Sequence, residues 1–365
     1  MSVVSTDTLV VQDLSVPFGT RPGLHKASLR VASGERVVIV GPSGAGKTSL
    51  LRAIAGLTGI THGSVAIGGR DVTQLHPEQR GAVYMHQTPL LFPHLNVYEN
   101  VAFPLRVRGV AQADISDRVH DALVNVQLDA LASRAPETLS GGQLHRAALA
   151  RAVVGRPALL LLDEPFSSLD PSLREEVRDA LVALQEKFRL SVLLITHDID
   201  EASRLADRIG VLKDGGILQM GTPAEMFEAP ASPAIAVALG RRAILDGTLN
   251  AHGELRCALG VVVVDAAELP EVGIAPGNAE IGVLVLFLPG ALSLIEPLPD
   301  GPVFQVQRIT YGGDGATAQL SAGQMPFDIP IPASAPAGGD APSTIAMGAH
   351  VSVRITPSRI RLFRP

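Results

Sequence analysis

Hydrophobic residues in the first 235 positions of the chain follow two different spacings. Short runs of Val, Ile and Leu predict strands, whereas apolar residues that recur every three or four positions predict helices. The expected strands are 8–16, 29–37, 64–67, 158–162 and 191–196, with turns at 18–19 and 33–34. The expected helices are 49–57, 114–131, 146–154 and 173–188. The unbroken apolar run at 158–162 is typical of a strand buried on both faces. The pattern therefore predicts an α/β fold with helices on a largely parallel sheet.

The pattern changes near residue 240. Helical spacing fades, and apolar and polar residues alternate at 351–356 and 359–362. Further apolar runs at 261–264, 282–288 and 303–309 add candidate strands. We expect a first domain at 1–240 and a small all-β domain at 241–365, built as a barrel or sandwich. The Pro-, Ala- and Gly-rich segment 332–343 is expected to be an exposed loop.

Composition narrows the class of protein. The net charge is −6, so no basic field points to nucleic acid. Cys257 is the single cysteine, which excludes an intrachain disulfide. The N-terminus lacks the basic start and apolar core of a signal peptide, and the apolar stretch 281–295 is interrupted by Pro289 and Gly290. These features predict a soluble, cytoplasmic protein.

A phosphate-binding loop follows the apolar run at 37–40. The spacing from Gly41 to Thr48 matches G-x-x-x-x-G-K-[ST], between an expected strand and an expected helix. Glycines let the backbone N–H groups surround an anion, Lys47 would reach the β- and γ-phosphates, and the Thr48 hydroxyl would bind Mg²⁺. A dinucleotide fold is disfavoured, since its glycines fall at G-x-G-x-x-G. The residues expected to bind nucleotide here are Gly41, Ser43, Gly44, Ala45, Gly46, Lys47, Thr48 and Ser49.

Two acidic residues end the buried strand at 158–162. Asp163 is expected to hold Mg²⁺, directly or through water. Glu164 comes one residue later, where it could polarise the water that attacks a phosphate. A phosphate loop requires such a carboxylate on a neighbouring strand, so the two motifs support one another.

A second glycine motif, Leu139-Ser140-Gly141-Gly142-Gln143, stands before the expected helix at 146–154. One nucleotide needs only one phosphate loop, so this motif has no obvious role within a single site. Residues 1–235 resemble the ATP-binding cassette of ABC transporters, whose signature is LSGGQ. The order of motifs along the chain also matches that family: phosphate loop, Gln87, signature, acidic strand, Ser168-Leu169-Asp170 and Thr196-His197.

The resemblance implies a fold and a set of roles. It implies a cassette with a parallel core sheet, an antiparallel β subdomain and a helical subdomain at about 90–155, followed by an OB-like barrel. Phe18 matches the aromatic residue that stacks on adenine. Gln87 matches the residue that touches Mg²⁺ and water, and His197 the one that contacts the γ-phosphate. Asp170 matches the loop that crosses a dimer interface. Ser140, Gly141, Gly142 and Gln143 match the motif that closes a partner's site.

The implied activity is ATP hydrolysis with Mg²⁺, carried by Lys47, Gln87, Glu164 and His197. The implied assembly is a homodimer, or a heterodimer with a related cassette. Because the chain shows no membrane helix, the pore would be formed by separate integral membrane permease subunits, with the cassette at the cytoplasmic face of the inner membrane. The β domain resembles the regulatory domain of importers that depend on an extracytoplasmic binding protein. Segments 89–95 and 97–100 resemble the part that docks the permease.

Several alternatives stay open. Ferric iron is the favoured cargo, ahead of sulfate or molybdate and then polyamines. The β domain is interpreted as a dimerisation module rather than an effector site. His145 and the Tyr84-Met85-His86 stretch depart from the usual family residues. A different class of protein, a soluble ABC ATPase that acts in regulation or assembly without a membrane partner, remains the alternative.

Overall fold

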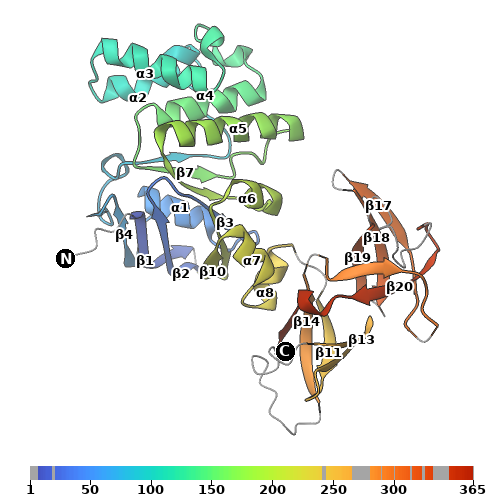
Figure 1. Cartoon of the computed structure of the whole chain (residues 1–365). Coiled ribbons are helices and arrows are strands. Elements are labelled where there is room, and N and C mark those ends of the chain that lie inside the picture. The colour runs from blue at the N-terminus through green and yellow to red at the C-terminus, as the bar shows by residue number, and fades with distance from the viewer. Residues whose placement is uncertain are drawn as a thin grey trace. The chain divides into compact units, whose positions relative to one another are not determined.

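The computed structural model describes residues 7–18, 21–240, 244–264, 280–288, 290–299, 301–312, 315–322, 325–331 and 345–364. The chain forms two compact units, Met1–Met226 and Phe227–Pro365 (Figure 1). Each unit has its own arrangement of sheets and is described by itself. The boundary near residue 240 between functional domains stays a prediction.

A six-stranded sheet lies at the centre of the first unit, in the order β10-β9-β3-β8-β7-β6. Its strands are β3 (Arg36–Val40), β6 (Ala82–Met85), β7 (Leu159–Asp163), β8 (Ser191–Ile195), β9 (Arg208–Lys213) and β10 (Gly216–Gly221). All neighbours are parallel except β9 and β10. Every residue of β7 and β8 is buried, as expected for central parallel strands. The α/β class is confirmed.

The second sheet of this unit is antiparallel and runs β2-β1-β4-β5. Its strands are β1 (Asp7–Phe18), β2 (Arg21–Ala32), β4 (His62–Ile67) and β5 (Arg70–Asp71). Leu9 and Val11 of this sheet share one buried cluster with Leu50 of α1 (Lys47–Ala55) and Leu161 of the central sheet. The helix α1 is thus packed between the two sheets, and this packing fixes the loop at its N-terminus.

The stretch expected as a strand at 29–37 is divided in two, at the turn expected at 33–34. A turn at Ser33-Gly34 separates β2 from β3, and these strands belong to different sheets. Gly34 has φ +74°, a left-handed conformation that ends a strand.

Three helices form a layer beside the central sheet: α2 (Val97–Val107), α3 (Gln112–Asn125) and α4 (Gly141–Val153). Figure 1 shows them stacked with α5 (Pro171–Phe188), and α4 packs against α2, α3, α5 and β6. The helix expected at 114–131 ends earlier, because Gln127 adopts φ +57° and a short 3-10 turn follows at Asp129–Leu131. A further helix of the unit, α6 (Ile199–Leu205), follows β8.

The described residues of the second unit form three small antiparallel sheets, in the orders β13-β12-β11-β14-β21, β15-β20-β16 and β17-β18-β19. The strands are β11 (Ile244–Leu249), β12 (Glu254–Cys257), β13 (Gly260–Val263), β14 (Ile281–Phe287), β15 (Leu292–Ile295), β16 (Phe304–Gln305), β17 (Arg308–Gly312), β18 (Gly315–Ala322), β19 (Met325–Ile331), β20 (His350–Ile355) and β21 (Ile360–Phe363). Buried residues from the three sheets, among them Val285, Phe304 and Ile329, form one core. The all-β character is therefore confirmed, whereas an OB-like barrel stays a prediction.

The expected strand at 303–309 is divided in two, β16 and β17. The loop expected at 332–343 lies outside the described residues. Two short helices, α7 (Pro223–Glu228) and α8 (Pro233–Ala238), precede the β strands, and Ala236 of α8 packs on Leu286 and Leu288. Among the helices that the structure describes, none combines the length and apolar character needed to cross a bilayer.

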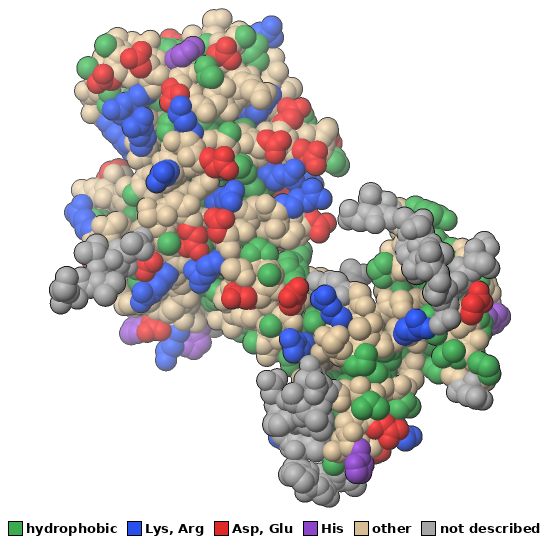
Figure 2. Space-filling model, in the orientation of Figure 1, with side chains coloured by type: hydrophobic (Ala, Val, Ile, Leu, Met, Phe, Trp, Pro, Cys, Tyr) green, Lys and Arg blue, Asp and Glu red, His purple; other side chains and the backbone are tan. Residues whose placement is uncertain are grey.

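Charged side chains of both signs are interspersed on the visible face of the first unit (Figure 2). This distribution agrees with the small net charge of −6. Several Lys and Arg side chains there lie beside Asp or Glu, so the surface field on this face is mixed rather than basic.

Candidate functional site

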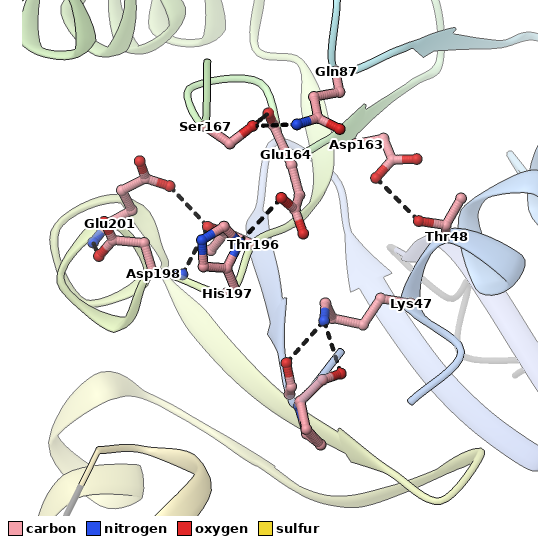
Figure 3. Close-up of polar contacts among 12 residues, drawn as sticks. Lys47, Thr48, Gln87, Asp163, Glu164, Ser167, Thr196, His197, Asp198 and Glu201 are labelled. Carbon is pink, nitrogen blue, oxygen red and sulfur yellow. Dashed lines mark hydrogen bonds and ion pairs between the residues drawn. The ribbon is translucent and has the colours of Figure 1, made fainter. Parts of the chain in front are cut away.

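Four neighbouring strands end at the same edge of the central sheet. Parallel strands β3, β8, β7 and β6 are adjacent in that order, so the loops after them meet at their carboxyl ends. These loops carry Lys47 after β3, His197 after β8, Asp163 and Glu164 at the end of β7, and Gln87 after β6. Figure 3 shows these side chains gathered in one place. The structure thus brings together all four expected catalytic residues and the expected metal carboxylate.

The phosphate loop is held close to neighbouring backbone. A Cβ atom at Gly41 would lie 2.0 Å from the carbonyl oxygen of Leu212, and one at Gly46 would lie 2.4 Å from that of Gly23. Gly46 also has φ +104°, so a side chain there would be strained as well as crowded. Ser43 and Gly44 form the exposed tip of the loop.

The Lys47 ammonium group is buried against this loop. Its Nζ donates hydrogen bonds to the carbonyl oxygens of Gly41 at 2.8 Å and Pro42 at 3.1 Å. Burial lowers the pKa of Lys47, while the charges of Glu164 and Asp163 oppose that shift. The loop carbonyls satisfy two of the three ammonium protons, which offsets the cost of burying the charge.

Both carboxylate oxygens of Asp163 have protein partners. Thr48 Oγ1 lies 3.3 Å from Oδ1, and the Tyr84 hydroxyl donates to Oδ2 at 2.6 Å. Asp163 is only 8% exposed, so its carboxylate has little contact with solvent. Burial, followed by the hydrogen bond to Asp163, raises the pKa of Tyr84 far above its ordinary value, so the hydroxyl stays protonated and donates.

Glu164 turns sharply away from the end of β7. Its φ of +46° is unusual for a residue with a side chain, and its N–H donates to the carbonyl oxygen of Ile195 on β8. Its Oε2 lies 3.0 Å from Nδ1 of His197. Gln87 does not contact Asp163 or Thr48 by a hydrogen bond in the described structure; its Nε2 donates to Ser167 Oγ at 2.9 Å.

The loop that carries His197 is fixed from behind. Thr196 Oγ1 donates to Glu201 at 2.8 Å, and the Asp198 carboxylate caps α6 by accepting from the N–H groups of Asp200 and Glu201. Burial raises the pKa of Glu201. These contacts hold the backbone while the imidazole of His197 stays 60% exposed beside Glu164.

A cavity of about 520 Å³ opens between these elements. Its lining residues come from α1, from β6 and the segment after it, and from the end of β7: Thr48, Arg52, Tyr84, His86, Gln87, Thr88, Leu90, Asp163 and Glu164. Hydroxyl, amide and carboxylate oxygens therefore line the wall next to Lys47, which is a donor set that Mg²⁺ prefers.

The second glycine motif begins α4, in the helical layer. Ser140 is the N-cap: its Oγ accepts from the Gln143 N–H at 3.3 Å, and its own N–H donates to Gln143 Oε1 at 3.0 Å. Gly141 is exposed, and a Cβ there would meet nothing within 4 Å, whereas one at Gly142 would lie 3.0 Å from Leu173. Within the described residues, this motif makes no hydrogen bond to the phosphate loop.

Other expected residues lie at the margins. Asp170 is the exposed N-cap residue of α5, and its side chain makes no capping bond. Phe18 ends β1, but its side chain lies outside the described part of the structure. The sequence analysis missed Tyr84 and Ser167 as partners of Asp163 and Gln87. The available signal for Tyr84 was a polar aromatic residue in a short strand, β6, that pairs with β7, the strand ending in Asp163.

The sequence of the chain is similar to those of known proteins. The ABC transporter family model matches residues 24–167. A sulfate/thiosulfate import ATP-binding protein of Rhizobium meliloti is 37% identical over 362 residues, which covers 97% of this chain and 93% of that protein. This chain belongs to the ABC transporter family, as an import ATP-binding subunit.

Two further relatives of this cassette carry different cargo names. A spermidine/putrescine import ATP-binding protein of Legionella pneumophila (strain Paris) is 43% identical over 67% of each chain. An sn-glycerol-3-phosphate import ATP-binding protein of Salmonella choleraesuis is 44% identical over 63% of this chain and 65% of its own length. The cassette is thus an ATPase of the import type, and these names leave its cargo undetermined.

Proposed function

We propose that this cassette hydrolyses ATP as half of a head-to-tail pair, and that each site is completed by Ser140 and Gly141 of the other copy. The supporting observation is the position of this motif. It is exposed at the N-terminus of α4 and has no hydrogen bond to its own phosphate loop among the described residues. A helix N-terminus attracts anions, so a second chain's triphosphate is a fitting occupant.

The oxygen-rich wall of the cavity fits Mg²⁺. Thr48 Oγ1 and Asp163 Oδ1 are 3.3 Å apart and would hold the ion together, with Gln87 as a further ligand. Mg²⁺ takes oxygen ligands and keeps several waters, which suits a site with few protein ligands. When bound, the ion neutralises charge on the phosphate oxygens.

The residues divide the work of hydrolysis. Lys47 leaves the carbonyls of Gly41 and Pro42 to contact the β- and γ-phosphates. Glu164 orients a water molecule, whose oxygen attacks the γ-phosphorus while the bond to the bridging oxygen of ADP breaks. His197 holds the Glu164 carboxylate in place and contacts the γ-phosphate. Catalysis then comes mainly from positioning and charge neutralisation.

The head-to-tail pairing has a direct test. Ser140→Arg places a bulky cation at the exposed motif, and it should block ATP-dependent dimers while the monomer still binds ATP. The matched control is Ser203→Arg, at another exposed serine at the end of α6. Loss of ATP binding by the Ser140→Arg monomer would contradict a role in trans.

The membrane partner is expected at an exposed apolar area of the cassette. Leu90, Phe103 and Val107 are 66%, 39% and 71% exposed, around a cavity of about 150 Å³ lined by Pro89, Pro104 and Arg151 among others. Arg151 supports this segment, because its guanidinium stacks over Phe92 at 5.3 Å and donates to the Leu90 carbonyl. An apolar rim of this kind suits a helix of a permease.

Co-purification tests this assignment against the alternative of a cassette without a membrane partner. The tagged chain, solubilised from membranes in detergent, should bring down integral membrane subunits, and Leu90→Asp should abolish this. Leu218→Asp, at an exposed leucine on β10, is the control. Failure of the wild-type chain to retain any membrane subunit would favour the soluble alternative.

For the cargo we propose an oxyanion of the sulfate class, delivered by an extracytoplasmic binding protein. The support is the sulfate/thiosulfate relative, whose match extends through the β domain to 97% of this chain. Ferric iron, expected first from the sequence, is not named by the relatives reported above. The test measures the uptake of radiolabelled sulfate, spermidine and ferric iron by cells that carry Lys47→Ala. We expect these cells to lose sulfate uptake alone. Loss of spermidine or ferric iron uptake would overturn the proposed cargo.

A further inference from the structure

Tyr84 has no role in the proposed chemistry. Its hydroxyl nevertheless donates a short hydrogen bond of 2.6 Å to Asp163. Strand β6 pairs in parallel with β7, and Tyr84 is the register partner of Leu161. Side chains of one strand alternate between faces, so Leu161 and Asp163 point to the same face, and Tyr84 shares it. The contact is therefore a consequence of the strand register.

The geometry divides the Asp163 carboxylate between two hydroxyls. Oδ1 faces Thr48 and Oδ2 accepts from Tyr84. No cation forms an ion pair with Asp163 among the described residues, because Lys47 donates to loop carbonyls instead. The Tyr84 bond thus fixes the carboxylate plane and leaves Oδ1 beside Thr48.

The Tyr84 ring is itself held in place. It packs against the main buried cluster of the first unit, and the ring of His86 contacts it in a T-shaped arrangement with centroids 4.6 Å apart. A ring fixed on both sides gives its hydroxyl one direction, towards Asp163.

From this arrangement we propose that Tyr84 is a positioning residue, which holds Asp163 so that Asp163 and Thr48 present a preformed pair of oxygen ligands to Mg²⁺. The inference rests on the metal role given to these two residues under the proposed function. Hydrogen bonds behind a metal ligand typically change metal affinity by about 10- to 100-fold when removed.

The test uses the full chain with Tyr84→Phe, which removes one oxygen atom and keeps the ring. The affinity for the ATP analogue AMP-PNP is measured by calorimetry in excess Mg²⁺ and again in EDTA. The ratio of the two affinities reports the contribution of the metal, without any turnover. We expect this ratio to fall about tenfold in Tyr84→Phe, with the EDTA affinity unchanged.

Tyr98→Phe is the matched control, because the Tyr98 hydroxyl makes no hydrogen bond in the described structure and the residue lies in the same unit. It should leave both affinities unchanged. Equal ratios in wild type and Tyr84→Phe would overturn the proposal, and so would an equal loss in both conditions, since that would indicate a nucleotide contact or misfolding. A wild-type chain that binds no AMP-PNP would instead contradict the proposed function.

Discussion

Nδ1 of His197 lies 3.0 Å from Oε2 of Glu164, although the two residues follow different strands of the central sheet. The bond joins the residue proposed to orient water to the one proposed to contact the γ-phosphate. Glu164 also has a left-handed backbone conformation, and backbone strain of this kind concentrates at functional sites.

Glu164→Gln should retain ATP binding and lose turnover. The amide can still accept from His197, so the geometry persists, but it cannot take up a proton from water. We expect kcat to fall by about 10²–10⁴-fold, the usual range for a general base. Steady-state ATPase assays measure this, with the exposed Glu175→Gln as control. Wild-type turnover in Glu164→Gln would remove Glu164 from the mechanism.

Gly141→Ala should separate assembly from folding. No atom lies within 4 Å of the added methyl group, and Gly141 is the first residue of α4, so the substitution should leave the melting temperature unchanged or slightly raised. If the motif contacts a second chain, the methyl group should still reduce ATP-dependent dimers and ATPase activity at least tenfold. Gly59→Ala, at another uncrowded glycine, is the control. Undiminished activity would show that no partner approaches Gly141.

Arg80 is a third residue, after Tyr84 and Ser167, whose role the sequence pattern does not predict. It is 6% exposed, and its guanidinium donates to the carbonyl oxygens of Ala53 and Ile54 at the end of α1 and to those of Thr73 and Leu75. Arg80→Ala should lower the free energy of unfolding by ~3 kcal/mol, because buried carbonyls lose charged donors. Urea denaturation measures this, with the exposed Arg70→Ala as control. A change below ~0.5 kcal/mol would contradict the assigned role.

Much of the cassette could be predicted because its signals are local. The strand runs, the phosphate loop and the acidic strand end are each contiguous in sequence. Tyr84 and Arg80 depend instead on strand register and on partners 79 and 26–27 residues away. The turn at Ser33-Gly34 could be predicted from a local signal as well, since a Ser-Gly pair marks a turn.

The Arg36–Asp207 pair should make stability depend on pH. Burial by itself raises the pKa of Asp207, but hydrogen bonds from the Arg36 side chain and backbone, together with its charge, hold the pKa below the ordinary value. Since the pKa of Asp207 is lower in the folded state than in the unfolded state, the ion pair stabilises the fold above the unfolded pKa of about 3.9. This stabilisation is lost as the pH falls through the folded pKa.

Asp207→Asn should therefore lower the melting temperature at pH 7 and match wild type in strong acid. The side chain is 43% exposed, so the effect should stay below ~1 kcal/mol. Thermal unfolding across this pH range measures it, and Asp117→Asn, at an exposed position on α3, serves as control. If the melting temperature of Asp207→Asn stays equally far below that of wild type in strong acid, the Arg36–Asp207 pair is not the cause of the difference.

Each phosphate loop is proposed to be closed by the Ser140–Gln143 motif of another chain, and a cross-link between the two can test this directly. The background chain carries Cys257→Ser and Glu164→Gln. One variant of it receives Ser43→Cys and a second receives Ser140→Cys. The two variants are mixed and treated with a short thiol cross-linker. We expect a covalent dimer that forms only when both variants are present and ATP has been added. Cross-linking within a single chain that carries both substitutions, with no dimer in the mixture, would contradict it.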